Sequence, residues 1–331
     1  MAGSKVKGPA NGPAKGRTKG RIKGRVLPVL ALFAALLMLL HDRIPNRVGG
    51  LGSLVQTFLP WSGIVVLLLA GLALLRRSRL ALVAVLVPAL VWTALHAGTF
   101  TDRTAAATAA AGTRTATLTV VTHNVDDENP DPAGTARALA ATGAQLIALE
   151  ELVEPATGRY AEALAGAYPY HEVRGTVGLW STYPLRDTRA VPIMEWTRAL
   201  RTTAQTPEGP VTVYVAHLPS VRVRPASGFD TARRNAAARR LAEAVRGGPA
   251  GRTLLLGDLN STTGDRAVAP LMTQFRPAHD AAGAGFGFSW PAGFPVARID
   301  HVLVRGLTPE SAWTLPATAS DHLPVAARVR F

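Results

Sequence analysis

The chain has 331 residues, a formal net charge of +14 and no cysteine. The absence of cysteine excludes disulfides, zinc–thiolate sites and cysteine nucleophiles. The length allows one large domain together with accessory segments.

The positive charge is concentrated in the N-terminal third of the chain. Residues 118–331 contain 21 Arg and no Lys against 20 acidic residues, whereas residues 1–117 contain the other 15 basic residues and only two acids, Asp42 and Asp102. A high net charge is typical of proteins that bind nucleic acid or an anionic surface. Because the C-terminal part is nearly neutral, the overall charge does not indicate that this part binds DNA.

The N-terminal third reads as a basic tail followed by a membrane anchor. Residues 1–25 are rich in Gly, Lys and Arg, and we expect a disordered tail there. Apolar runs follow at 26–41, 51–75 and 80–97, and a membrane-spanning helix needs about 20 such residues. The alternatives are buried helices of a soluble domain or, for the first run, a secretory signal sequence. Three apolar runs in close succession favour an all-α anchor of three transmembrane helices over residues 26–97.

The distribution of basic residues predicts the orientation of this anchor. Arg76, Arg77 and Arg79 lie between the second and third runs, and the tail is strongly basic, whereas the first loop holds only Arg43 and Arg47. Positively charged loops remain on the cytoplasmic side. We therefore expect a multi-pass protein of the cell membrane, with a cytoplasmic N-terminus and an extracellular C-terminal domain.

An Ala- and Thr-rich linker over residues 98–117 leads into a domain at 118–331 in which apolar strands and helical patterns are mixed. Helices are predicted at 132–142, 158–166 and 231–245, and strands at 118–122, 146–149, 177–180, 199–203, 211–216, 253–256, 299–304 and 325–331. The many strands and few helices indicate an α+β fold, with a mixed sheet sandwich flanked by helices.

Polar side chains recur where these predicted strands begin or end. They are Asn124 and Asp126, Glu150 and Glu151, His217, Asp258 and Asn260, Asp300, and Asp321 with His322. Taken singly, Asn124 is typical of a turn, Glu151 of a solvated helix start and His217 of a buried core histidine. The Asp258-Leu-Asn260 stretch after an apolar strand is as typical of a turn as of a functional site. Taken together, they form a set of carboxylates and amides that suits a hard cation such as Mg²⁺, beside histidines that suit proton transfer.

Seven short motifs then appear in an order that resembles the endonuclease/exonuclease/phosphatase superfamily, also called DNase I-like. The motifs are Thr-His-Asn-Val at 122–125, Leu-Ile-Ala-Leu-Glu-Glu at 146–151, Val-Gly-Leu-Trp-Ser-Thr-Tyr-Pro at 177–184, Ala-His-Leu at 216–218, Gly-Asp-Leu-Asn at 257–260, Arg-Ile-Asp-His at 298–301 and Ser-Asp-His-Leu-Pro at 320–324. The resemblance covers residues 118–331. It implies a four-layer α/β/β/α sandwich in a membrane-anchored, bacterial-type member.

The same resemblance implies roles for individual residues. Asn124 and Glu151 would hold the divalent metal, Mg²⁺ with Mn²⁺ and Ca²⁺ as alternatives, and Asp321 would be a further ligand. Asp258 would orient or deprotonate the attacking water, and Asn260 would bind the scissile phosphate. His322, oriented by Asp300, would bind a phosphate oxygen or assist proton transfer. His217 would clamp the phosphate or protonate the leaving group.

Some assignments remain open at this level. Gln145 and Glu150 stand where the family often has Asp and Gln, so the choice of Glu151 over Glu150 rests on spacing from the strand. Asp126 matches a metal-site acid of the nuclease branch but is equally a loop acid. Arg222 and Arg224 follow His217 closely in the sequence, and contact with a phosphate bound there and a solvated surface position are equal alternatives for them.

Two functions follow as hypotheses. The first is a membrane-anchored, divalent-metal-dependent phosphoesterase whose substrate is a nucleic acid, a phospholipid headgroup or a small phosphoester. The second is a catalytically inactive extracellular binding or sensing domain on the same fold. Because every expected metal and histidine position is filled, the sequence favours the enzyme. It predicts neither the substrate nor the oligomeric state.

Overall fold

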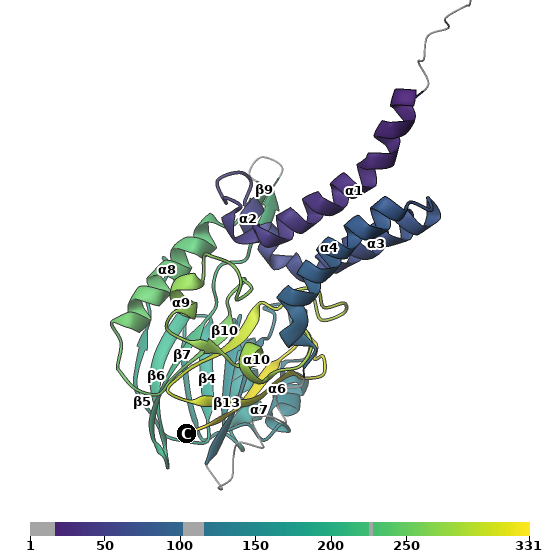
Figure 1. Ribbon diagram of the computed structural model, residues 1–331. Coiled ribbons are helices and arrows are strands. Elements are labelled where there is room, and N and C mark those ends of the chain that lie inside the picture. The colour runs from purple at the N-terminus through teal and green to yellow at the C-terminus, as the bar shows by residue number, and fades with distance from the viewer. Residues whose placement is uncertain (1–16, 102–115, 225–227) are drawn as a thin grey trace, which may run out of the picture. The chain divides into compact units, whose positions relative to one another are not determined.

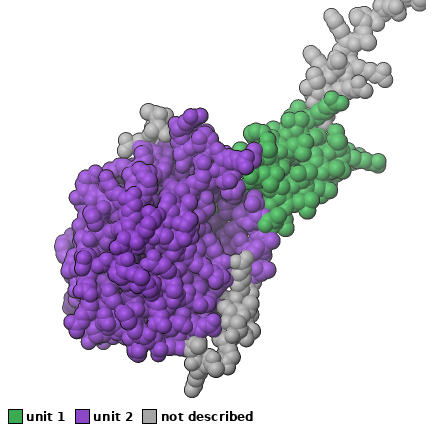
Figure 2. Space-filling view, turned by 60° about the vertical axis from the view of Figure 1, so that its left-hand side comes forward, with its two compact units in different colours: residues 1–39, 61–94 green, residues 40–60, 95–331 purple. Residues whose placement is uncertain are grey.

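The computed structural model describes residues 17–101, 116–224 and 228–331, which divide into two compact units (Figures 1 and 2). One unit is formed by the described residues up to Leu39 together with Trp61–Ala94. The other combines Leu40–Pro60 with Leu95–Phe331. The segment 40–60, which the sequence assigned to the membrane anchor, therefore belongs to the unit that contains the sandwich.

The first unit consists of α1 (Arg17–Leu39), α3 (Ser62–Leu75) and most of α4 (Arg79–His96). Helix α1 starts at Arg17, inside the stretch expected to be a disordered tail, and residues 1–16 lie outside the described part. Among the described residues, one helix, Arg79–Thr99, is long and apolar enough to cross a membrane. A second span requires α2 and the helix up to Leu75 to act as one segment bent by 65°, and Arg25–Leu39 is shorter than a span. Among the described residues, therefore, the helices long enough to span a membrane number one, or two with the bent segment, and not the three that the sequence predicted.

The second unit contains two six-stranded mixed sheets. The first has the order β13-β14-β1-β2-β4-β3, and the second has the order β11-β12-β10-β7-β6-β5. A two-stranded ribbon of β8 and β9 follows β7. The strands are β1 (Thr117–Asn124), β2 (Leu146–Glu150), β3 (Tyr170–Arg174), β4 (Val177–Ser181), β5 (Leu185–Ala190), β6 (Ala199–Thr206), β7 (Gly209–Ala216), β8 (Arg222–Arg224), β9 (Gly228–Asp230), β10 (Thr253–Asp258), β11 (Arg276–Pro277), β12 (Asp300–Arg305), β13 (Thr308–Thr314) and β14 (Val325–Arg330).

Three apolar clusters hold the layers together. Leu118 and Val120 of β1 meet Leu254 and Leu256 of β10 between the two sheets. Because side chains alternate along a strand, the other residues of the same strands face outward. There, helices cover both sheets: α6 (Pro132–Ala140) and α7 (Ala156–Leu164) pack on the first, and α8 (Ala232–Arg246) packs on the second (Figure 1). The result is an α/β sandwich of mixed sheets flanked by helices, as expected from the sequence.

The short helices of the second unit are α2 (Leu51–Thr57), α9 (Ala269–Met272) and α10 (Ala278–Ala282). Helix α2 lies beside β9, and Phe229 N donates to Gly49 O at 2.9 Å (Figure 1). Ser53 and Gln56 of α2 are buried, although they are polar. This segment therefore turns a polar face to the sandwich, which a transmembrane helix in lipid would not do.

Candidate active site

The candidate site lies at the edge of the sandwich where four central strands end. Strands β1 and β2 run parallel and end at Asn124 and Glu150, and β7 and β10 run parallel and end at Ala216 and Asp258. The antiparallel strand β12 begins at Asp300, which pairs directly with Asp258. His217 follows β7, and His322 precedes β14, which pairs with β1. The topology thus gathers polar residues that are up to 198 positions apart, from Asn124 to His322.

Asp258 is the centre of this group. It is 1% exposed, and its Oδ2 accepts hydrogen bonds from Asn124 Nδ2 and Asn260 Nδ2, both at 3.1 Å. The same oxygen lies 3.6 Å from His217 Nε2 and 3.9 Å from His322 Nε2. Since Asn124 belongs to one sheet and Asp258 to the other, their hydrogen bond joins the two sheets at the site.

Burial changes the protonation of Asp258. Loss of solvent and the neighbouring Asp300 carboxylate raise its pKa to about 7, against the opposing effects of His322 and two hydrogen bonds. A carboxylate whose pKa lies near neutrality can accept a proton from water and release it again. The geometry and the pKa together give Asp258 the properties of a general base.

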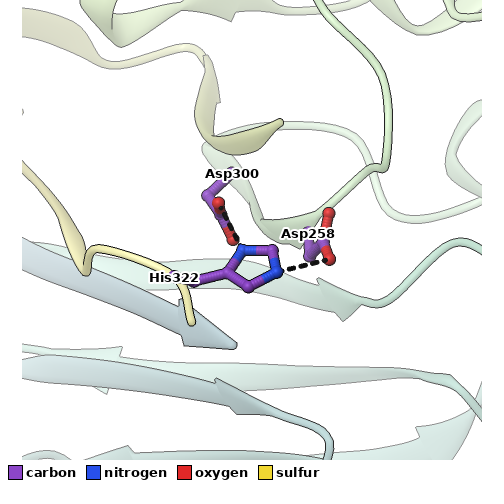
Figure 3. Close-up of side chains that lie close together, drawn as sticks. All are labelled: Asp258, Asp300 and His322. Carbon is purple, nitrogen blue, oxygen red and sulfur yellow. Dashed lines mark hydrogen bonds and ion pairs between the residues drawn. The ribbon is translucent and has the colours of Figure 1, made fainter. Parts of the chain in front are cut away.

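Asp300 and His322 form a buried pair next to it (Figure 3). His322 Nδ1 lies 2.9 Å from Asp300 Oδ2. Burial opposes a charged imidazole, but Asp300, Asp258 and Asp321 raise the pKa of His322 to about 10. Burial would raise the pKa of Asp300, yet the His322 cation holds it below the ordinary value. The pair is therefore a carboxylate and an imidazolium, whose Nε2 lies 3.9 Å from Asp258 Oδ2 and 3.8 Å from Asp321 Oδ1.

His217 has the opposite character. It is 1% exposed, and burial together with Arg198 lowers its pKa well below the ordinary value. The Arg198 guanidinium contacts both ring nitrogens, and His217 Nε2 lies 3.5 Å from Glu151 Oε1. A neutral imidazole can donate one hydrogen bond to a phosphate but holds no extra proton for a leaving group.

The two adjacent glutamates differ sharply. Glu150 is fully buried, its Oε1 accepts a hydrogen bond from Thr122 at 2.9 Å, and burial raises its pKa well above the ordinary value. Glu151 has a positive φ of 63°, which turns it out of the strand, and its side chain is 29% exposed. Glu151 is therefore the glutamate that is accessible beside His217.

The acids around Glu151 are suited to hold a metal ion. One oxygen of each of Asp126, Asp127 and Glu151 lies within 4.8 Å of the others. Asn124 Oδ1 accepts one hydrogen bond, from Asp126 N, and retains a second lone pair. These hard oxygen donors fit a cation such as Mg²⁺. Asp321 belongs to neither converging group of the described residues, and its Oδ2 instead accepts a hydrogen bond from Trp290 Nε1 at 3.0 Å.

Asn260, which the sequence predicts to bind the scissile phosphate, lies beside Asp258. Its φ is 46°, and its amide donates to Leu218 O at 2.9 Å as well as to Asp258. With both amide protons directed at these acceptors, Asn260 is placed to orient Asp258. The turn also needs Gly257, whose φ is 144° and where an added Cβ would lie 1.9 Å from Ala216 O.

Arg222 lines a cleft of about 170 Å³ beside the site, together with Trp196, Arg198 and Arg233. The side chain of Arg224 lies outside the described residues. Sequence reasoning missed Arg198, Asp127, Trp290 and Ser320. Ser320 Oγ donates to Asn124 O at 2.7 Å and accepts from His322 N, which ties the His322 turn to β1. In the sequence, only the position of Ser320 directly before Asp321-His322 indicated that it contributes to the site. Arg198 lies in none of the sequence motifs, so nothing in the sequence indicated it.

Comparisons with known proteins agree with the observed fold. The chain is similar to D. rerio TDP2 complexed with single strand DNA product, at a TM-score of 0.55 and 17% identity over 65% of this chain and all of that one. It is also similar to a mutant of the beta toxin from Staphylococcus aureus with bound magnesium ions, at a TM-score of 0.52 and 16% identity over 64% of this chain and 99% of that one.

A third similar structure is an endonuclease/exonuclease/phosphatase family protein from Bacteroides thetaiotaomicron, at a TM-score of 0.54 and 14% identity over 66% of this chain and 99% of that one. These likenesses concern the fold. A comparison with curated protein sequences finds no match. The sequence profile of the Endonuclease/Exonuclease/phosphatase family matches residues 121–322, which is more than half of the chain. The chain therefore belongs to the endonuclease/exonuclease/phosphatase family.

Proposed function

We propose that the protein is a membrane-attached, divalent-metal-dependent phosphoesterase. The observation that carries this proposal is the convergence of Asp258, Asp300 and His322 next to the acids around Glu151. Membership of the family and the fold shared with a structure that holds magnesium ions support it.

In this mechanism, Asn124 and Glu151 would hold the cation, with Asp126 beside them. The cation would neutralise phosphate charge and stabilise charge on the leaving oxygen. Asp258, oriented by Asn260, takes a proton from water, whose oxygen attacks phosphorus. The bond from phosphorus to the leaving alkoxide breaks, and that oxygen takes a proton from solvent. His322 donates from Nε2 to a phosphate oxygen, and His217 donates a neutral hydrogen bond.

The test is hydrolysis of bis(4-nitrophenyl) phosphate by the full chain in detergent. We expect activity with Mg²⁺ that a chelator removes and that added metal restores. Asp258→Asn should lower kcat by about 10²- to 10⁴-fold because it removes the base. Asp187→Asn is the matched control, since Asp187 is exposed on β5 and its φ of 55° suits Asn. Full activity of Asp258→Asn would contradict the proposed roles.

Membrane attachment is part of the proposal. Only 22% of the apolar window in Arg79–Thr99 is buried, whereas a core helix of a soluble protein is mostly buried. Large side chains such as Leu75 and Leu90 are 81% and 70% exposed, which suits contact with lipid. The proposed orientation has the enzyme domain outside the cell. Protease added to intact cells should then cleave this domain, and the fragments should be seen on a denaturing gel. Protection of the domain from protease would contradict this orientation.

A further inference from the structure

The edge of the sandwich that carries the candidate site is also the edge that contacts the segments leading into the apolar helices. The segment 40–60 continues along the chain into α1 at one end and α3 at the other. Phe229 N in β9 donates to Gly49 O, and an added Cβ on Gly50 would lie 1.9 Å from Phe229 O. The ribbon that follows His217 is thus packed backbone to backbone on this segment.

A buried arginine makes a second connection. Arg234, which is 1% exposed, donates to Ser53 Oγ at 3.0 Å, to Asp265 Oδ2 at 2.6 Å and to Asn260 O at 3.0 Å. Arg266 N donates to Gln56 Oε1 at 3.3 Å. The turn that carries Asn260 is therefore hydrogen-bonded, through one side chain, to helix α2.

A third connection lies on the other side of the site. Gly285 N donates to Thr99 O at 2.8 Å, and Thr99 is the last residue of the candidate span. The ring of Phe286 packs edge-on against His96 and Phe100. The loop that starts there leads to Trp290, which donates to Asp321 beside His322.

These three connections determine which edge lies near a bilayer. If the apolar helices lie in lipid, chain continuity keeps residues 40–60 and 95–101 at its surface. The loops that surround the candidate site are bonded to those residues within one compact unit. The opposite edge is remote, because Tyr170 pairs with Ser181, which pairs with Leu146 at the start of β2.

The rim of the site has the composition of a lipid-contacting surface. Val223 on the ribbon is 81% exposed, Phe294 on the loop after Trp290 is 69% exposed, and Trp196 beside the cleft is 47% exposed. The same cleft is lined by Arg198, Arg222 and Arg233. Aromatic and apolar side chains next to guanidinium groups suit the headgroup layer of a membrane with anionic phosphates.

We infer that the substrate is a phospholipid whose phosphoester is presented from the bilayer to this edge, an inference that rests on the proposed phosphoesterase activity and membrane attachment. The reaction consumes one water: the oxygen bonds to phosphorus, one ester P–O bond breaks, and the leaving oxygen is protonated.

The experiment uses the full chain reconstituted into vesicles of phosphatidylcholine and phosphatidylglycerol, with Mg²⁺. Release of phosphorus-containing headgroup products or phosphorylated lipid is measured, and bis(4-nitrophenyl) phosphate and single-stranded DNA are assayed in parallel. Phe294→Ser and Val223→Ser should each lower lipid turnover about tenfold, by loss of apolar burial, and leave hydrolysis of the soluble diester unchanged. Tyr170→Ser, at the remote edge and 41% exposed, is the matched control and should change neither.

The outcomes separate the two levels of the proposal. Lipid hydrolysis that falls selectively in the rim variants supports the inference. Hydrolysis of the soluble diester or of DNA without lipid hydrolysis overturns the inference and leaves the phosphoesterase in place. Equal loss in the rim variants and in Tyr170→Ser also overturns it. No hydrolysis of any substrate with Mg²⁺ overturns the proposed function itself.

Discussion

At the scale of single residues, the candidate site depends on how Asp300 sets the charge of His322. The 2.9 Å contact and the negative charge of Asp300 keep His322 protonated up to a pKa of about 10. An imidazolium is the form that can donate from Nε2 to a phosphate oxygen while Nδ1 donates to Asp300. In the proposed mechanism, the Asp300 carboxylate would act by keeping His322 protonated.

This arrangement predicts a change in the pH–rate profile. Asp300→Asn keeps the shape but removes the charge, so the pKa of His322 should fall toward its ordinary value of 6.5. Activity that needs the protonated ring should then decline as pH rises through neutrality, whereas in the wild type it persists to about pH 10. Steady-state rates with bis(4-nitrophenyl) phosphate between pH 5 and 10, a window set by these two pKa values, measure the shift. If the rate of Asp300→Asn at alkaline pH declines no earlier than that of the wild type, the prediction is wrong.

Arg234 is a positioning residue for the Asn260 turn. Replacement by Met removes the hydrogen bond to Asn260 O and leaves Asp265 buried without its cation. Breaking a buried ion pair in this way costs about 3–5 kcal/mol of unfolding free energy. Denaturant unfolding of the full chain in detergent measures the loss.

The effect on the site is separable from the effect on stability. Arg234→Lys retains the positive charge but loses the planar guanidinium group that donates hydrogen bonds to Asn260, Ser53 and Asp265. We expect it to recover part of the stability and still lower kcat more than it raises KM, since Asn260 orients Asp258. A Lys variant with wild-type kcat would mean that Arg234 is only structural.

At the scale of elements, the buried strands follow from the sequence and the edge strands do not. Strands β2 and β10 are apolar runs that are entirely buried, and their predicted limits lie close to the observed ones. Strands β3 and β5 were missed because they are largely exposed at the ends of the sheets and show no apolar alternation. Strand β13 was missed as well, since it too lies at a sheet end.

The candidate site shows the same division. Asp258, His322 and Asp300 lie in motifs at strand ends, so the sequence predicts them. Arg198 does not, because its contact with His217 depends on the antiparallel register of β6 and β7, in which Ala199 pairs with Ala216. The packing of α2 on the sandwich also depends on tertiary contacts, since an apolar run with a few polar residues resembles part of a membrane helix.

The packing of α2 can be tested at Gly50. Its φ is 64°, and a Cβ there would collide with Phe229 O, so Gly50→Ala should push α2 away from β9. We expect faster hydrogen exchange at the Phe229 amide, which donates to Gly49 O. Gly143→Ala is the matched control, because its φ of 66° imposes the same strain with open space around the Cβ. Equal protection of Phe229 in both variants would contradict the close packing.

At the scale of the whole molecule, buried neutral histidines make stability depend on pH. Burial lowers the pKa of His123 to about 3 and that of His301 to about 4, from the ordinary value of 6.5. Between these values the unfolded chain binds protons that the folded chain does not, so acid favours unfolding.

We therefore expect the unfolding free energy to fall as pH decreases from 6.5 toward 4, by up to about 1.4 kcal/mol per pH unit for each histidine. Denaturant titrations of the full chain at several pH values measure the slope. His123→Asn should make the slope shallower, because one of the buried histidines that take up a proton on unfolding is gone. A stability that does not depend on pH across this window would refute the prediction.

The hydrogen bonds from Arg234 to Ser53 and from Phe229 to Gly49 also bear on how the enzyme domain could be shed from cells. The Ala- and Thr-rich stretch at 102–115 is one covalent tether, and these contacts are a second, non-covalent one. A protease that cuts only in that stretch should leave residues 116–331 sedimenting with membranes under native conditions. If the protein is attached to a membrane as proposed, release of the domain should require denaturant in addition to cleavage.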